Sequence, residues 1–316
     1  MTKIAVIAHR RKSLGGGLDE LRSLLADEGV TAPLWYEVDK SRKAPKRVRQ
    51  AVEKGADLVL VWGGDGMVQR CADALAATRT PVGILPAGTA NLLAGNLGIP
   101  QDLAAALRIA LHGVRRPVDL GRLNKEHFAV MAGVGFDAAM VSDADRDLKD
   151  RLGRLAYVWT GLRHVGDEAV GVRIRVDGEQ WYAGPASCVL LGNVSTITGG
   201  IRVFDGAEPG DGVLHVGVTT AEGAMQWART MARVALDRSE KSPFVEITRG
   251  RRIDVRFDRS MIYELDGGER GRAKRLKAKA VPGALIVGVD PAADLGGDGQ
   301  GGATATAGAV GEPARR

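Results

Sequence analysis

The residues best suited to chemistry follow a short apolar run at residues 58–62, which ends abruptly in Gly63-Gly64-Asp65-Gly66. Apolar side chains then recur at helical spacing, so this stretch is predicted to be a strand-to-helix turn. Glycine lets a ligand approach the main chain closely, and a helix N-terminus offers free N–H groups to phosphate. Because an acid has no packing purpose in an anion site, we interpret Asp65 as holding a cation or a hydroxyl beside the phosphates.

A second unit of the same kind follows directly. Residues 82–85 are predicted to be a strand, residues 86–91 read Pro-Ala-Gly-Thr-Ala-Asn, and a short helix continues to Leu97. Turns at the carboxyl ends of neighbouring parallel strands open onto one crevice, which is the usual ligand position in an open α/β sheet. The two glycine-rich turns are therefore expected to form one phosphate-binding site.

The elements that must position these turns alternate along the first part of the chain. Predicted strands at 4–8, 34–38 and 58–62 are separated by predicted helices at 18–28 and 44–54, which indicates βαβ units and a parallel sheet. From Val118 onward strand-like segments predominate, with a helix expected at 145–165, and this pattern is typical of an antiparallel β domain. We expect an α/β domain at 1–121, a β-rich domain at 122–290 and a disordered Gly- and Ala-rich tail at 291–316.

Composition limits the cellular setting. The two cysteines, Cys71 and Cys188, are far apart and lack metal-binding spacing, which favours a reducing cytoplasm over a disulfide or zinc framework. No apolar run approaches the length of a membrane span. The net charge of +6 is compatible with attraction to an anionic membrane surface and equally with simple solubility.

The combination of GGDG, GTAN about twenty residues later, and then LGIP resembles the catalytic domain of the diacylglycerol kinase-like lipid kinases, which include sphingosine and ceramide kinases. Met67 stands where that family usually has threonine. NAD kinases and phosphofructokinases share the GGDG turn but lack the GTANLLAGNLGIP stretch. The resemblance implies an NAD kinase- or phosphofructokinase-like α/β domain with a parallel sheet, followed by a mainly antiparallel β-sandwich domain.

The resemblance also implies ATP and Mg²⁺ as cofactors. The residues it assigns to the nucleotide are Gly63, Gly64, Asp65, Gly66, Met67, Gly88, Thr89 and Asn91. Related kinases carry a further phosphate loop after the first strand. This chain departs from that pattern with His9-Arg10-Arg11-Lys12, and Ser13 with Gly15 to Gly17 are candidates for the same purpose.

Two acidic segments in the β domain take their roles from the same resemblance. Glu208, Asp211 and the carbonyl of Val213 correspond to a structural Mg²⁺ site in related bacterial enzymes, and a plain Asp-Gly turn is the alternative. The segment Leu265-Asp266-Gly267-Gly268-Glu269 matches the family's Asp-Gly-Glu with one extra glycine. In that family one of these acids accepts the proton of the substrate hydroxyl, and the insertion leaves Asp266 and Glu269 both open as the base.

The expected activity is ATP-dependent transfer of the γ-phosphate to a lipid alcohol, chiefly diacylglycerol, which gives phosphatidic acid. The alternatives are an NAD kinase-like enzyme with a soluble substrate and a nucleotide-binding membrane-surface module without turnover. The expected partners are the lipid alcohol and an anionic membrane surface, which the cytoplasmic enzyme meets peripherally. No nucleic acid is expected, and a homodimer is left open. Basic clusters at 42–49, 249–252 and 274–279 are the candidates for membrane docking.

Overall fold

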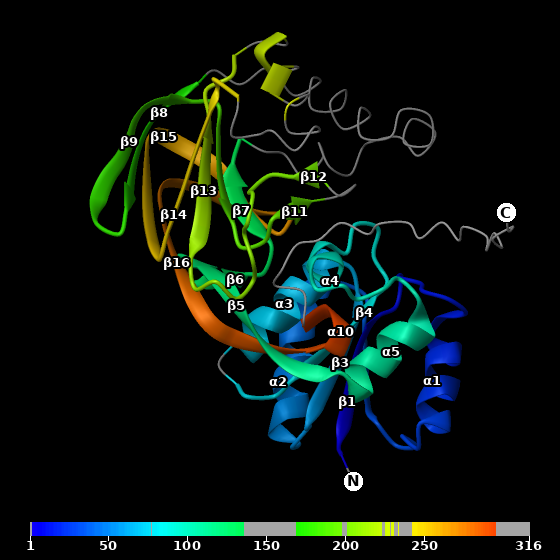
Figure 1. The fold of residues 1–316 in the computed structure, drawn as a ribbon. Coiled ribbons are helices and arrows are strands. Elements are labelled where there is room, and N and C mark those ends of the chain that lie inside the picture. The colour runs from blue at the N-terminus through cyan, green and yellow to red at the C-terminus, as the bar shows by residue number, and fades with distance from the viewer. Residues whose placement is uncertain are drawn as a thin grey trace, which may run out of the picture.

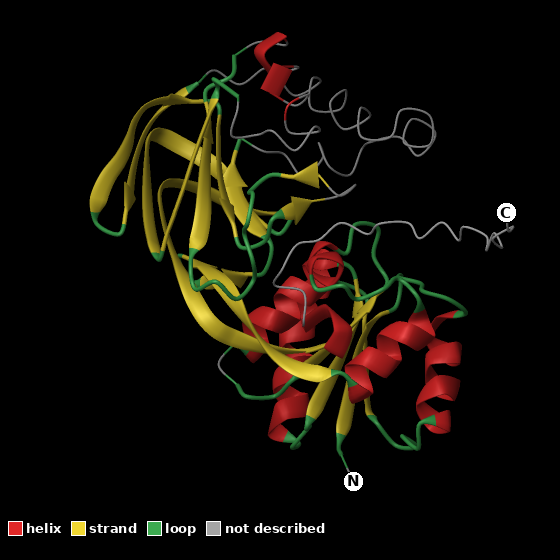
Figure 2. Ribbon diagram, in the orientation of Figure 1, coloured by secondary structure: helices red, strands yellow, loops and turns green. Residues whose placement is uncertain are grey.

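The computed structural model describes residues 2–76, 78–135, 169–197, 201–222, 225–227, 229–230, 233 and 242–294. In Figure 1 the first part of the chain forms a layer of strands flanked by helices, and the later part forms a separate stack of strands. Figure 2 shows that helices gather in the first unit and strands dominate the second. The α/β domain and the antiparallel β domain expected from the sequence are thus confirmed.

The α/β domain is built on four parallel strands in the order β2-β1-β3-β4. These strands are β1 (Ile4–His9), β2 (Leu34–Val38), β3 (Leu58–Gly63) and β4 (Val82–Pro86). Their helices are α1 (Gly17–Asp27), α2 (Ala44–Glu53), α3 (Asp65–Leu75), α4 (Leu92–Asn96) and α5 (Leu103–His112), with a 3₁₀ turn η1 (Ser41–Lys43). Every residue of β3 and β4 is buried, which explains why these strands are nearly continuous apolar runs rather than alternating ones.

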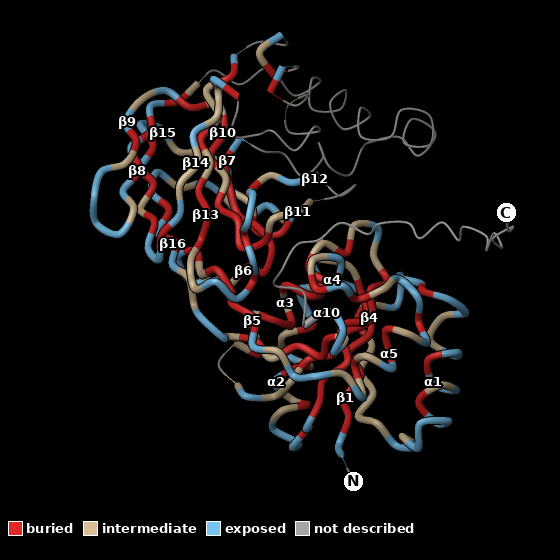
Figure 3. The backbone as a smooth tube through the Cα atoms, viewed as in Figure 1, coloured by how far each residue is buried: buried red, intermediate tan, exposed pale blue. Residues whose placement is uncertain are grey.

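The β domain is antiparallel. Its strands are β5 (Val114–Leu123), β6 (Glu126–Phe128), β7 (Met131–Val134), β8 (Val170–Val176), β9 (Glu179–Ala186), β10 (Cys188–Gly192), β11 (Thr196–Ile197), β12 (Ile201–Arg202), β13 (Leu214–Thr219), β14 (Val245–Gly250), β15 (Arg252–Leu265) and β16 (Gly268–Val289). Alternate residues of β8, β15 and β16 point into a second core, and Figure 3 shows buried and exposed segments interleaved along these strands.

The long strand β16 joins the two domains. It runs from Gly268 to Val289 and shifts register between Val281 and Leu285 against β5. Its far end returns to the parallel sheet, where Val287 pairs with Val82 of β4. In the part of the chain that the structure describes, 14 strands therefore form one continuous sheet, and the expected boundary at Gly121 falls inside β5.

The C-terminal end departs from the expectation of disorder at one point. Residues 291–294 form a short helix, α10 (Pro291–Asp294), directly after β16, so disorder is wrong for these four residues. Residues 295–316 and the helix expected at 145–165 lie outside the described residues. Among the helices that the structure describes, none is long and apolar enough to cross a membrane.

Candidate active site

The two glycine-rich turns touch each other. A Cβ atom placed on Gly88 would lie 2.4 Å from the Cα of Gly64, and one placed on Gly64 would lie 3.0 Å from the Cα of Gly88. Only glycine at both positions allows the two main chains to pack at this distance. One cavity of about 430 Å³ is lined by both turns and by residues of the β domain, and we call it the cleft. The predicted meeting of the two turns at one site is confirmed.

Asp65 connects the two turns. It is the first residue of α3, and its Oδ1 accepts the backbone N–H of Leu92 at 2.5 Å, at the start of α4. Burial raises the pKa of Asp65, although backbone N–H groups around Leu92 act in the opposite direction. The expectation that this acid has no structural purpose is therefore wrong. Asp65 also lines the cleft, so the same residue both connects the two turns and borders the space for a ligand.

Asn91 shapes the second turn from within. Its backbone is left-handed, with φ of 50°, and its side-chain Oδ1 accepts the N–H of Gly88 at 2.8 Å. Its Nδ2 donates to the carbonyls of Gly88 and Pro86 at 2.9 and 3.2 Å. The amide is fully used in the turn and does not line the cleft, whereas Thr89 and Ala90 do. Asn91 thus positions the residues that face a ligand rather than facing it.

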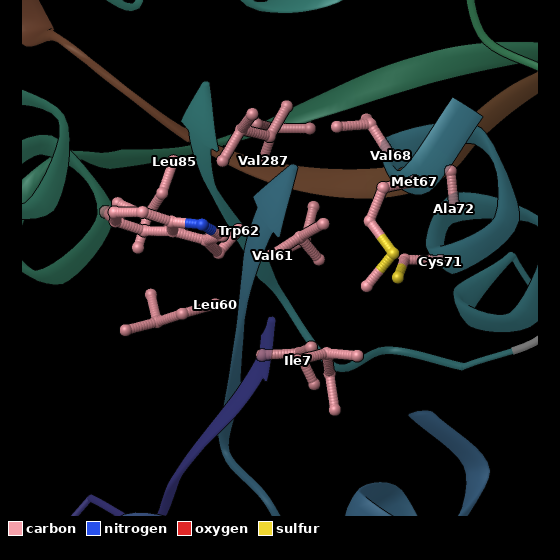
Figure 4. Packing of buried hydrophobic residues seen from close by; sticks show 14 of the residues in the cluster. Ile7, Leu60, Val61, Trp62, Met67, Val68, Cys71, Ala72, Leu85 and Val287 are labelled. Carbon is pink, nitrogen blue, oxygen red and sulfur yellow. The ribbon is translucent and has the colours of Figure 1, made fainter. Parts of the chain in front are cut away.

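Met67 is a core residue rather than a free ligand contact. Its side chain is 2% exposed and points toward Cys71 and Val61 in Figure 4, while its N–H donates to the Gly64 carbonyl at 2.8 Å. It also covers Gly63, because a Cβ placed there would lie 2.5 Å from the Met67 Cβ. Gly63 and Met67 therefore build the floor of the turn, and Met67 also borders the cleft.

The end of β1 and the loop that follows it each contribute one side chain to the cleft. His9 and Lys12 line it, together with Ser41 from η1. Burial and the neighbouring Lys12 lower the pKa of His9, so this imidazole is neutral at pH 7. The candidates chosen from sequence, Ser13 and Gly15 to Gly17, are not among the residues that line it. Lys12 is thus the cation that lines the cleft in the segment where related kinases carry a phosphate loop.

Asp266 faces the glycine turns from the β domain. It opens the two-residue turn between β15 and β16, with φ of 44°, and Gly267 follows at 74°. Its Oδ1 accepts the N–H groups of Val130 and Met131, each at 2.9 Å, and its Oδ2 accepts that of Ala129 at 2.7 Å. Burial raises the pKa of Asp266 to about 6 despite these donors, and the negative charge of Asp65 acts in the same direction.

The second acid at this turn is not the expected one. Glu269 is exposed and does not line the cleft, although it pairs with Glu264 across the β15–β16 hairpin. Glu264, two residues before Asp266 on β15, lines the cleft instead. The sequence did contain a signal for Glu264, because it stands two residues before Asp266 and both residues line the cleft. Glu269 is accordingly withdrawn as a candidate base.

A network of polar side chains links α3 to the turn that carries Asp266. Arg270 donates to Gln69 Oε1 at 3.0 Å and pairs with Glu126 at 2.8 Å, and Arg70 pairs with the same carboxylate at 2.9 Å. Gln69, 1% exposed, also donates to the carbonyl of His127 at 2.6 Å. The helix that begins at Asp65 and the turn that presents Asp266 are thereby held in one arrangement.

Part of the wall of the cleft is apolar. Leu92 of α4 lies on one side, and Met131 of β7, Leu190 of β10 and Ile197 of β11 approach from the β domain. These residues are distant in sequence and show no common motif, so sequence patterns could not have identified them. The cleft therefore combines two glycine-rich turns, the buried acid Asp266, the half-buried acid Asp65 and a hydrophobic surface.

The predicted Mg²⁺ turn at Glu208, Asp211 and Val213 lies outside the cleft. Asp211 Oδ1 accepts the N–H of Val213 at 3.0 Å and its Oδ2 accepts that of Glu208 at 3.4 Å, so the carboxylate closes its own turn. His215 Nε2, which has no hydrogen-bond partner among the described residues, lies 3.4 Å from Asp211 Oδ2. These hydrogen bonds describe a closed turn, and the cation site of two carboxylates and one carbonyl stays a prediction.

The fold and the cleft together define a two-domain kinase, in which an α/β layer with two glycine-rich turns faces acids of an antiparallel β domain. Comparison with known families agrees. Residues 6–123 match the diacylglycerol kinase catalytic domain, and residues 129–289 match the YegS C-terminal NAD kinase beta sandwich-like domain. The chain belongs to this family of YegS-like lipid kinases, as the sequence resemblance indicated.

Individual relatives support the assignment over most of the chain. A "probable lipid kinase YegS-like" of Klebsiella pneumoniae is 31% identical over 272 residues, covering 85% of this chain and 89% of the relative. An uncharacterized protein of Synechocystis is 32% identical over 211 residues, 65% of this chain but 48% of that protein. The structure of a diacylglycerol kinase from Bacillus anthracis str. Sterne superposes with a TM-score of 0.74 at 22% identity, covering 92% and 98% of the two chains, which confirms the fold.

Proposed function

We propose that this protein transfers the γ-phosphate of ATP to the hydroxyl of a lipid alcohol, with diacylglycerol as the acceptor and phosphatidic acid as the product. The observation that carries the proposal is the position of Asp266 in one cleft with both glycine turns and with the apolar wall of Leu92, Met131, Leu190 and Ile197. The glycine turns suit the phosphates of a nucleotide, and the apolar wall suits an acyl chain. The acid is where the two substrates would meet.

The glycine turns and Lys12 are the proposed phosphate contacts. Asp65 and Gly66 at the N-terminus of α3 line the cleft, and the helix brings a partial positive charge to it. Gly66 leaves its side open, since a Cβ atom placed on it would meet no atom within 4 Å. Thr89 and Ala90 border the same space from the second turn. Asp65 fits a role in holding Mg²⁺ beside the phosphates, where the ion would neutralise developing charge during phosphoryl transfer.

Asp266 is the proposed general base. Its three N–H donors occupy three of about four lone-pair positions of a carboxylate, which leaves one position on Oδ2 for the acceptor hydroxyl. With a pKa of about 6 the group is ionised at neutral pH and basic enough to accept a proton. The hydroxyl oxygen forms a bond to the γ-phosphorus, the bond from that phosphorus to the bridging oxygen breaks, ADP leaves, and the proton passes to Asp266.

The deciding experiment uses radiolabelled ATP with a panel of lipid alcohols in mixed micelles, with and without Mg²⁺. We expect labelled phosphatidic acid from diacylglycerol, and none when Mg²⁺ is chelated. NAD is included as a soluble acceptor in the absence of lipid. Label transferred to NAD alone would select the NAD kinase-like alternative, and ATP binding without transfer to any acceptor would select the module without turnover.

We further propose that the enzyme meets its acceptor at the membrane surface from the cytoplasm. The support is the net charge of +6 together with an acceptor that resides in a bilayer. Co-sedimentation with vesicles that contain diacylglycerol tests this point, and retention of all protein in the supernatant at low salt would count against it.

A further inference from the structure

The outer face of the β domain carries a regular array of cations far from the cleft. Strand register aligns Arg122 of β5, Lys279 of β16 and Arg252 of β15 as direct neighbours, and aligns Arg175 of β8, Asp254 of β15 and Lys277 of β16 in the next row. The intervening residues of these strands point the other way into the core, which fixes the charged side chains on the surface. Two sequence clusters thus become one surface, which also includes two arginines, Arg122 and Arg175, that lie in neither cluster.

This array surrounds a hollow rather than a flat surface. Arg122, Arg175, Arg252, Lys277 and Lys279 line a cavity of about 490 Å³, which we call the basic pocket. It shares no lining residue with the cleft. Along β15, Asp254 and Asp266 are separated by about twelve residues, or roughly 40 Å of strand at about 3.3 Å per residue. The basic pocket is therefore a separate site.

The charge in the basic pocket is not balanced by the described part of the protein. Among the described residues, Asp254 is the one acid that lines it, and its carboxylate is already bound by Arg275, through Nε at 2.8 Å and through Nη2. The neighbouring acid Asp177 accepts the backbone N–H groups of Arg251 and Arg252 at 3.1 and 2.7 Å. Arg122 Nε is buried and has no hydrogen-bond partner within the described ranges. Like charges gathered at one cavity repel one another unless an anion lies among them.

We propose that the basic pocket binds a phosphate group of a ligand other than the nucleotide in the cleft. Guanidinium groups bind phosphate oxygens through paired N–H donors, and a phosphomonoester supplies up to about two negative charges and three acceptor oxygens. Arg122 offers a donor for which the described part of the chain provides no acceptor. The lining residues that the structure describes include no aromatic ring, so the pocket lacks the stacking surface that nucleic-acid bases use.

Two sources could supply this group, a phosphate-bearing lipid headgroup or a soluble phosphate compound. The test compares the parent with the double variant Arg252→Gln/Lys279→Gln. The matched control is Lys46→Gln/Arg49→Gln, which removes the same charge from the surface of α2. Binding of inorganic phosphate is measured by calorimetry at low salt. Binding to phosphatidylcholine vesicles, with and without phosphatidic acid, is measured by sedimentation. The cleft is the same in all three proteins, so ligand bound there cancels in the comparison.

We expect the pocket variant to lose about ten-fold or more in affinity for at least one of these probes, and the control to bind like the parent. Loss of phosphate binding identifies a soluble ligand class. Loss confined to phosphatidic acid vesicles identifies a headgroup. Equal binding by pocket variant and parent to both probes, or an equal loss in the control, overturns the proposal. Melting temperatures verify that all three proteins are folded, and no step depends on whether the chain is a kinase.

Discussion

Replacing Asp266 with asparagine removes the proposed base while keeping the size of the side chain. The carboxylate accepts three backbone N–H groups through both oxygens, and an asparagine has only one acceptor oxygen. If that oxygen keeps the hydrogen bonds from the N–H groups of Val130 and Met131, the new NH₂ group faces the N–H of Ala129. One buried donor left without a partner costs about 1–3 kcal/mol, partly offset because a charge no longer has to be buried. The variant is expected to be folded but less stable.

The effect on catalysis should be much larger than the effect on stability. A positioned general base contributes about 10²–10⁴ in rate, so turnover of diacylglycerol should fall by this factor while ATP affinity stays close to that of the parent. The pH dependence of turnover provides an independent test of Asp266 as the base. Because burial raises the pKa of Asp266 to about 6, parent activity should rise as the pH increases through 6, where the carboxylate loses its proton. The variant should lack this rise.

The assay is single-turnover transfer from labelled ATP in mixed micelles between about pH 5 and 8, with circular dichroism at each pH to confirm folding. Glu269→Gln is the matched control, because Glu269 is an exposed acid on the same turn and should tolerate the change within a few-fold. Near-normal turnover by Asp266→Asn, with the parent's pH profile retained, would refute the reasoning. A large loss in the Glu269 variant would restore that acid as the base.

Three further substitutions test the turns. Asp65→Asn should retain the hydrogen bond to Leu92 through its amide oxygen and remain folded, yet lose about 10²–10³ in turnover; activity within a few-fold of the parent would exclude the proposed role in phosphoryl transfer. Gly64→Val should collide with the backbone of Gly88, so calorimetry should show loss of ATP binding and melting should show lower stability, whereas unchanged values for both would contradict the packed-turn geometry. Asp211→Ala removes two turn hydrogen bonds and should cost about 1–2 kcal/mol equally with and without Mg²⁺; a loss seen only with Mg²⁺ would establish the cation site.

Much of the α/β domain was predictable from the sequence because local signals and tertiary structure agree there. The apolar runs of β3 and β4 are buried on both faces, and each ends in glycines whose spacing required a close backbone approach. Asp266 was likewise identified, since its motif survives beside the inserted glycine. These features depend on residues that are near one another in sequence.

The remaining part of the site depends on contacts that local patterns do not encode. Glu264 and Glu269 pair directly across the β15–β16 hairpin, and nothing in the local sequence shows that Glu264 borders the cleft while Glu269 does not. Asn91 was assigned to the nucleotide because of its neighbours, but its hydrogen bonds hold its side chain within the turn. Met67 borders the cleft, yet most of its side chain is buried in the core. The apolar wall combines α4, β7, β10 and β11, so it exists only after the sheets have assembled.

The strand β16 begins beside Asp266 and ends beside β4, whose last residues open the second glycine turn. Together with β5, it carries the main chain between the two halves of the kinase. Their shared ladder is interrupted between Val281 and Leu285, where Gly283 has φ of 58° and donates its N–H to Asp119 at 2.7 Å. A two-stranded ribbon bends most readily where its hydrogen-bond ladder is broken. Opening and closing of the halves around two substrates would therefore use this interruption as its hinge, with Asp119 acting as its restraint.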